Sequence, residues 1–109
     1  MKVLDIHVEE TNKTYQLLIG QNKMENHNLL KSCSPNDLWF HLEKQSSQHM
    51  ILKCNGDPIP KRYLNYIGSL FHKNNKHYTV IYTYLKHVKM TNEPGVVIPT
   101  SCKLNRISF

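Results

Sequence analysis

The sequence of 109 residues contains no long apolar run and no export signal. A helix needs about 20 consecutive apolar residues to cross a bilayer, and no stretch approaches that length. The first residues, Met1 to Asp5, lack the basic and then apolar layout of a secretion signal. These absences predict a protein without a membrane span that is located in the cytoplasm, with the nucleus as the alternative.

Cysteine is scarce, and its spacing fits no metal or redox motif. Cys33, Cys54 and Cys102 form an odd, widely separated set without a C-x-x-C pair. The seven histidines include no H-E-x-x-H motif. A metal shared by His41 and His49 would need a third ligand from elsewhere in the chain. The sequence therefore predicts free thiols in a reducing compartment and no metal or other cofactor.

Acidic residues are nearly missing from the second half of the chain. Residues 58–109 carry eight Lys or Arg and one acid, Glu93, which gives a net charge of +7. Residues 1–57 carry six Lys and seven acids, which gives −1. Such asymmetry is typical of a surface that binds a polyanion, although simple solvation of the basic residues is an alternative.

The most informative stretch is residues 37–54, where two alternating runs surround a polar linker. A period of two is typical of strands, and two such runs in sequence predict a hairpin. Placing Phe40 opposite Met50 puts His41 opposite His49. One face of this hairpin is then apolar and belongs to the core. The other face is expected to carry Trp39, His41, His49 and Lys53.

Alternation and helical spacing along the rest of the chain predict a single α+β domain covering residues 1–109. The first helix is expected over residues 22–33, and the second from Pro60 to Phe71. The predicted order is β-β-α-β-β-α-β-β-β, a mainly antiparallel sheet with two helices on one side. The remaining strands are expected at residues 2–9, 14–19, 77–84, 96–98 and 103–109, and a polar connection at residues 72–76.

Short motifs follow one another in a characteristic order: Ile19-Gly20-Gln21-Asn22, Asp37-Leu38-Trp39-Phe40-His41, Ser46-Ser47 with His49, Tyr82-Thr83, Lys86-His87-Val88-Lys89 and Pro94-Gly95-Val96-Val97. In this order they resemble the NFACT-R domain, the RNA-binding module of ribosome-quality-control factors that add carboxy-terminal tails to stalled chains. The resemblance begins near residue 13, ends near residue 100, and extends to the small stand-alone proteins built on the same module. The large relatives also have an amino-terminal domain and coiled-coil arms, so this chain alone is not expected to elongate tails.

The resemblance implies a non-catalytic RNA-binding domain whose partners are tRNA or ribosomal RNA, with the ribosome or other quality-control proteins as further candidates. Aromatic rings beside imidazole and lysine can stack unpaired bases and neutralise phosphates. Asn22 and Lys23 lie where the family has a polar, often basic segment. The candidate nucleic-acid-binding residues are Trp39, His41, His49, Lys53, Lys86, His87, Lys89, Asn22 and Lys23.

Other interpretations of these residues remain open at this stage. Trp39 could fill a second hydrophobic layer under a helix, and both imidazoles could simply bond backbone groups. Asn22 could serve only as a helix cap. Two other functions compete: an adaptor that docks an acidic protein, and an RNA-cleaving enzyme that uses His41 and His49 as base and acid. The oligomeric state is not predicted.

Overall fold

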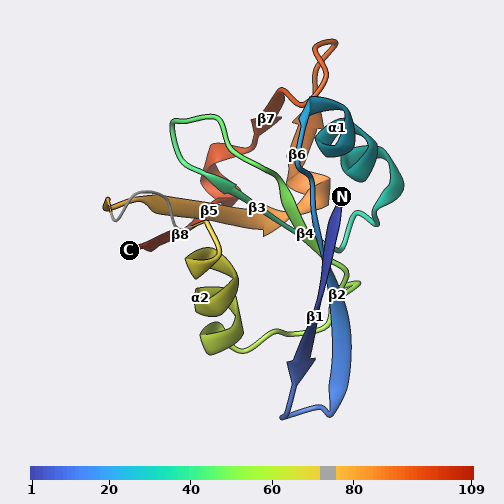
Figure 1. The fold of residues 1–109 in the computed structure, drawn as a ribbon, viewed down its shortest axis with the longest axis vertical. Coiled ribbons are helices and arrows are strands. Elements are labelled where there is room, and N and C mark those ends of the chain that lie inside the picture. The colour runs from blue at the N-terminus through green and yellow to red at the C-terminus, as the bar shows by residue number, and fades with distance from the viewer. Residues whose placement is uncertain (72–75) are drawn as a thin grey trace.

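The structure, a computed structural model, describes residues 1–71 and 76–109. A six-stranded antiparallel sheet has the order β1-β2-β4-β3-β5-β8, and a two-stranded ribbon, β6-β7, lies beside it (Figure 1). The predicted α+β class with two helices is confirmed. The elements are β1 (Lys2–Val8), β2 (Lys13–Ile19), α1 (Lys23–Ser32), β3 (Leu38–Leu42), β4 (Met50–Leu52), α2 (Lys61–Ser69), β5 (Thr79–Tyr84), β6 (Val88–Met90), β7 (Val97–Pro99) and β8 (Asn105–Ser108), with 3-10 helices at Leu85–His87 and Ser101–Lys103.

The central hairpin of β3 and β4 has the predicted register, with Phe40 opposite Met50 and Trp39 opposite Ile51. β2 pairs with the outer side of β4, and β5 pairs with the outer side of β3. The hairpin therefore lies in the middle of the sheet. The ribbon adds one strand, β6, to the predicted order. The polar connection predicted at residues 72–76 lies outside the described residues except for Lys76.

Both faces of the sheet carry a hydrophobic core, so the prediction that the helices share one side is wrong. α2 packs on the first face and α1 on the second (Figure 1). Strand side chains alternate between faces, which sends Phe40 and Met50 to the first core and Trp39 and Ile51 to the second. The second face holds the buried side chains of Trp39, Ile51 and Ile81, and α1 covers them there.

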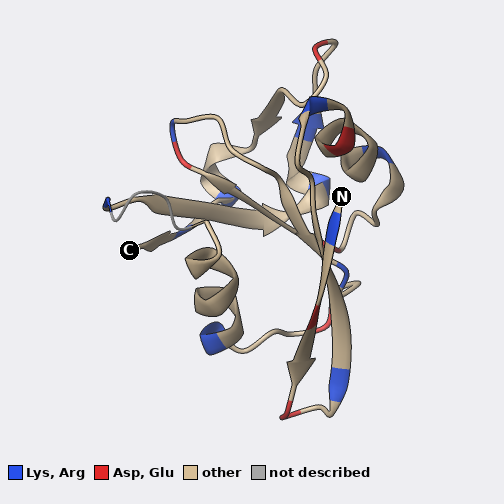
Figure 2. Ribbon diagram, viewed as in Figure 1, with Lys and Arg blue, Asp and Glu red and all other residues tan. Residues whose placement is uncertain are grey.

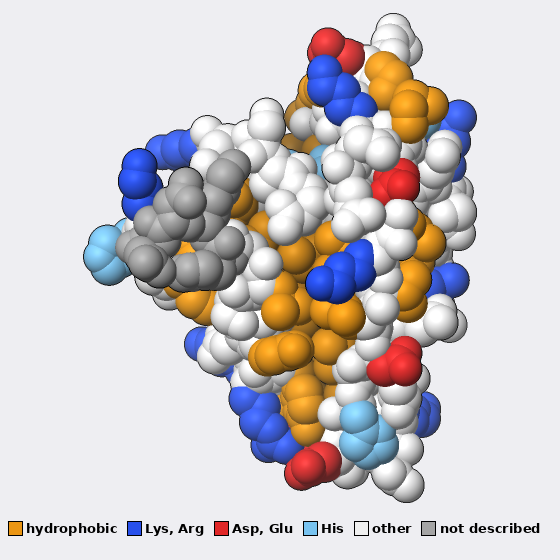
Figure 3. Space-filling view, in the orientation of Figure 1, with side chains coloured by type: hydrophobic (Ala, Val, Ile, Leu, Met, Phe, Trp, Pro, Cys, Tyr) orange, Lys and Arg blue, Asp and Glu red, His pale blue; other side chains and the backbone are white. Residues whose placement is uncertain are grey.

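The first core is only partly covered beside α2. On the side of the molecule drawn in Figure 3, hydrophobic side chains gather in a band between α2 and β1. Leu4 and Leu70 are partly buried and pack against the first core. Both residues also line the larger groove described next, so this apolar band leads into it.

Candidate nucleic-acid interface

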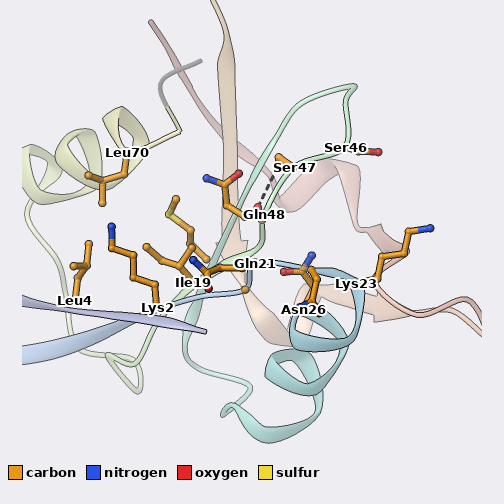
Figure 4. A pocket seen from close by; sticks show the side chains of 13 residues that line it. Lys2, Leu4, Ile19, Gln21, Lys23, Asn26, Ser46, Ser47, Gln48 and Leu70 are labelled. Atoms are coloured by element: carbon orange, nitrogen blue, oxygen red, sulfur yellow. Dashed lines mark hydrogen bonds between the residues drawn. The ribbon is translucent and has the colours of Figure 1, made fainter. Parts of the chain in front are cut away.

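The larger of two neighbouring grooves lies where β2 leads into α1 and where the loop between β3 and β4 passes (Figure 4). Its cavity volume is about 640 Å³. In Figure 4 the side chains of Lys2, Gln21 and Gln48 extend toward a common space. We call it the amide groove, and its polar lining residues are Lys2, Gln21, Asn22, Lys23, Asn26, Ser46, Ser47 and Gln48.

Three backbone and side-chain bonds hold the amide groove in shape. Asn22 caps α1, because its Oδ1 accepts from the backbone N–H of Glu25 at 2.9 Å. The backbone N–H of His49 donates to Oδ1 of Asn26 at 3.1 Å, and that of Gly20 donates to the carbonyl of His49 at 3.0 Å. The capping role considered for Asn22 is confirmed, and the same residue lines the groove.

The second groove, which we call the imidazole groove, lies on the other side of the loop between β3 and β4. Its cavity volume is about 410 Å³. One wall contains His41, and another comes from the β6-β7 ribbon through residues 94–97 and Pro99. Lys23 and Lys44 also line this groove. The indole of Trp39 and the imidazole of His49 complete its inner surface.

The two grooves adjoin, and no acidic residue of the described parts of the chain lines either of them. They share Lys23, Asn26 and the serines at 46 and 47. Figure 2 marks basic positions at the beginning of β1 and of α1, where Lys2 and Lys23 lie. Within residues 1–71 and 76–109, the ion pairs use the amino terminus, Lys13, Arg62 and Arg106 instead. The charges of Lys2, Lys23 and Lys44 are therefore available to an anion.

Trp39 does not protrude from the sheet, and neither does His49. Their exposed fractions are 1% and 2%, so the prediction that both face solvent is wrong. The indole packs in the second core under α1, together with Ile51 and Ile81. Its Nε1–H donates to Nδ1 of His49 at 3.0 Å. This arrangement satisfies the polar atom of a buried tryptophan, and the alternative of a second hydrophobic layer is confirmed.

His49 is a neutral, structural imidazole. Burial, followed by repulsion from the neighbouring His41, lowers the pKa of His49 to about 4. The ring centroids of the two histidines lie 4.7 Å apart. Because Nδ1 of His49 already accepts from Trp39, the protonated form would break that bond. This geometry disfavours the acid role that an RNA-cleaving mechanism would assign to His49.

His41 is half-buried and has one fixed tautomer. Its Nδ1 lies 2.6 Å from the carbonyl oxygen of Leu42, which can only accept, so Nδ1 carries the proton. The ring stacks on Trp39 with a centroid distance of 5.6 Å and an interplanar angle of 8°. Burial lowers the pKa of His41. The neutral ring therefore keeps Nε2 as a hydrogen-bond acceptor.

The buried histidine predicts a loss of stability in mild acid. An unfolded histidine titrates near its ordinary pKa of 6.5, whereas folded His49 titrates near 4, so the unfolded chain binds the extra proton between these values. We expect the free energy of unfolding to fall as the pH drops from 6.5 to 4, by up to about 1.4 kcal/mol per pH unit from this residue. Urea unfolding measured across that range tests this.

The matched variant for this pH series is His49→Gln, because a glutamine Oε1 can still accept a bond from Trp39 without titrating. In this variant the free energy of unfolding should change less steeply with pH than in the wild type. The remaining slope should come from His41, because burial lowers the pKa of His41 as well. A slope that is unchanged in His49→Gln would show that His49 does not titrate as described.

The remaining predicted site residues lie away from the two grooves. Lys53 is exposed, and its charge opposes the increase that burial and Asp37 cause in the pKa of the Cys33 thiol. Lys86 lines a small pocket with Cys33 and lies 5.6 Å from the ring centre of Tyr84. Lys89 is exposed on β6, and His87 is half-buried. The structure thus gathers Asn22, Lys23, Trp39, His41 and His49 at the grooves, and none of Lys53, Lys86, His87 and Lys89 lines them.

Some groove residues were absent from the predicted site. Lys2, Lys44 and Gln48 carry no sequence signal of their own, because nothing in a single sequence links β1 to the loop between β3 and β4. Gln21 and the serine pair could have been found, since they belong to the motifs that carried the resemblance. Among the described residues, no cluster of three or more His, Cys, Asp or Glu side chains could hold a metal ion.

A family comparison matches residues 4–102 to the NFACT protein RNA binding domain. The chain belongs to this family. In this NFACT RNA-binding domain, the segments at residues 19–22, 39–41, 46–49 and 94–97 converge on the two grooves although they are far apart in sequence. The described helices include none with the length and apolar character of a membrane span.

Curated relatives and a solved structure agree with this family. Coiled-coil domain-containing protein 25 of Mus musculus is 32% identical over 93 residues, which cover 76% of this chain and 45% of that protein. Its Danio rerio counterpart is 31% identical over 92 residues, with 75% and 44% covered. The chain thus spans less than half the length of these relatives. The carboxy-terminal part of the fibronectin/fibrinogen-binding protein from Streptococcus suis has the same fold, with a TM-score of 0.75, 19% identity and coverage of 99% of this chain and 45% of the other.

Proposed function

We propose that this NFACT RNA-binding domain binds structured RNA, such as tRNA or a ribosomal RNA surface, without chemistry of its own. The observation that carries the proposal is the adjoining pair of grooves, which among the described residues is lined by Lys2, Lys23 and Lys44 and by no acid. Lysines neutralise phosphates, while amide side chains both donate to and accept from bases and sugars. The proposal includes binding to ribosomes that carry stalled chains.

The curved, partly apolar surface suits folded or unpaired RNA better than a regular duplex. Sequence-dependent recognition of RNA mostly uses loops, bulges and ends, where base edges are accessible. The amide groove offers Gln21, Asn22 and Gln48 for such edges. The phosphate contacts should make affinity fall with salt by about one power of concentration per lysine engaged.

Reversing two groove charges is expected to abolish most of the binding. Lys2→Glu combined with Lys23→Glu should weaken tRNA binding roughly 10- to 100-fold at 50 mM salt and flatten the salt dependence between 50 and 300 mM. The fold should persist, because Lys2 and Lys23 are exposed and a glutamate suits the first turn of α1. Fluorescence anisotropy with labelled tRNA measures both quantities.

The matched control is Lys61→Glu with Lys76→Glu, which reverses the same number of exposed charges outside both grooves. Lys86→Glu with Lys89→Glu tests in the same way the two lysines of the predicted site that line neither groove. If all three pairs of substitutions weakened tRNA binding equally, binding would depend only on the net charge of the domain, which would contradict the proposed site. RNA recovered from the titrations should be intact on a denaturing gel, and its cleavage would contradict the non-catalytic function.

A further inference from the structure

The imidazole groove has the dimensions and lining of a pocket for a small planar group. Its volume of about 410 Å³ lies within the range of roughly 300–1,000 Å³ typical of ligand pockets. Its walls are mostly apolar, with Leu42 and Ile81 on one side and Val96 and Pro99 from the ribbon on the other. Such walls suit a flat aromatic ring, whereas the amide groove suits the charged and hydrated sugar-phosphate backbone of RNA.

The lining also has polar side chains, including Asn26, Ser46 and Ser47, and His41 adds an acceptor whose direction is fixed. Nδ1 of His41 donates to Leu42, and the ring stacks on Trp39, so the neutral imidazole can turn only Nε2 outward as an acceptor. The other ionisable groups that line the groove are His49, held neutral by its bond from Trp39, and the cations Lys23 and Lys44. The neutral acceptor therefore lies beside two positive charges.

Resting on the RNA-binding function proposed above, we propose that the imidazole groove receives one unpaired nucleobase of the bound RNA. An N–H group on the edge of that base donates to Nε2 of His41, and Lys23 and Lys44 contact the adjacent phosphates. In a duplex, the Watson–Crick edge of each base is engaged by the opposite strand, and the ring is stacked between its neighbours. A pocket that holds the ring and bonds that edge therefore selects a base that is unpaired and turned out of the helix.

The test compares two RNA hairpins that differ in one base. The first carries a single bulged nucleotide, and the second carries an abasic site at the same bulge, so that the backbone and its charges are unchanged. We expect the wild-type domain to bind the first hairpin roughly tenfold more tightly, because stacking and edge contacts to one base are lost in the second. Trp39, the only tryptophan in the chain, gives a fluorescence signal through its stacked contact with His41.

The deciding variant is His41→Phe, which keeps an aromatic ring on Trp39 and removes the acceptor. Its preference for the bulged base should fall to about twofold or less. The control His7→Ala removes an exposed histidine that bonds Thr14 and lines neither groove, and it should keep the full preference. Lys2→Glu with Lys23→Glu should weaken both hairpins.

The outcomes separate this inference from the function on which it rests. Tight, salt-dependent binding of both hairpins with equal affinity would overturn the base pocket while leaving RNA binding in place. An unchanged preference in His41→Phe would also overturn it, because the acceptor would then be irrelevant. Failure to bind either hairpin or tRNA at 50 mM salt would overturn both proposals.

Discussion

Trp39→Ala is expected to lower the free energy of unfolding by about 3–5 kcal/mol, the range found when a large buried aromatic side chain is truncated. The indole is 1% exposed and packs against Ile51 and Ile81 in the second core. Its removal would leave a cavity under α1 and would deprive Nδ1 of His49 of its donor at 3.0 Å. Urea unfolding followed by circular dichroism measures the loss.

The matched variant is Trp39→Phe, which keeps a smaller buried aromatic ring and removes the N–H donor. We expect it to lose about 1–3 kcal/mol and to bind tRNA as the wild type does, because Trp39 supports His41 from below and is almost inaccessible to a ligand. Wild-type stability of Trp39→Ala would contradict the buried position. Loss of RNA affinity in a fully folded Trp39→Phe would contradict the purely supporting role of Trp39.

Gly20→Ala is the second change with a large expected effect, about 2–4 kcal/mol of stability. An added Cβ would overlap Oδ1 of Asn26 and lie 3.1 Å from its backbone N. The Asn26 side chain cannot move away cheaply, since its Oδ1 accepts from the backbone N–H of buried His49. Because Asn26 lines both grooves, RNA affinity should fall together with stability. Unfolding and tRNA titration of the same preparation test both effects.

A double-mutant cycle tests whether the loss of stability in Gly20→Ala comes from the steric overlap with Asn26. In the background of Asn26→Ala, where Oδ1 is absent, Gly20→Ala should cost about 1 kcal/mol less than it does in the wild type. Additive effects of the two changes would show that Gly20 is needed for another reason. The residue has no positive φ, unlike Gly56 and Gly95, so backbone strain is not an alternative explanation.

Local sequence signals predicted the hairpin well. The alternation of residues 38–42 and 50–54 yielded the observed register, with Phe40 opposite Met50, because side-chain period and pairing are coupled in an antiparallel ribbon. The same alternation did not show that the second face would be covered. A tryptophan and two histidines beside polar residues are equally compatible with solvent or with a packed helix, and α1 is joined to this face only in three dimensions.

The predicted site illustrates the same limit. Lys53, Lys86 and Lys89 are basic and lie in suggestive motifs, but strand and ribbon geometry directs them away from the grooves. Lys2 and Lys44 were not predicted, although they line the amide groove and the imidazole groove respectively. Their positions depend on β1 lying at one edge of the sheet and on the path of a loop more than 40 residues away.

The α+β class, the central hairpin with its register and the likeness to an RNA-binding family could be predicted from the amino-acid sequence, because they depend on local periodicity and on motif order. The burial of Trp39 and His49, the bond that orients His41, and the position of Lys2, Lys23 and Lys44 at adjoining grooves emerge from the packing of the elements. Burial and proximity are set by which elements pack together, and a strand pattern does not specify what covers its second face.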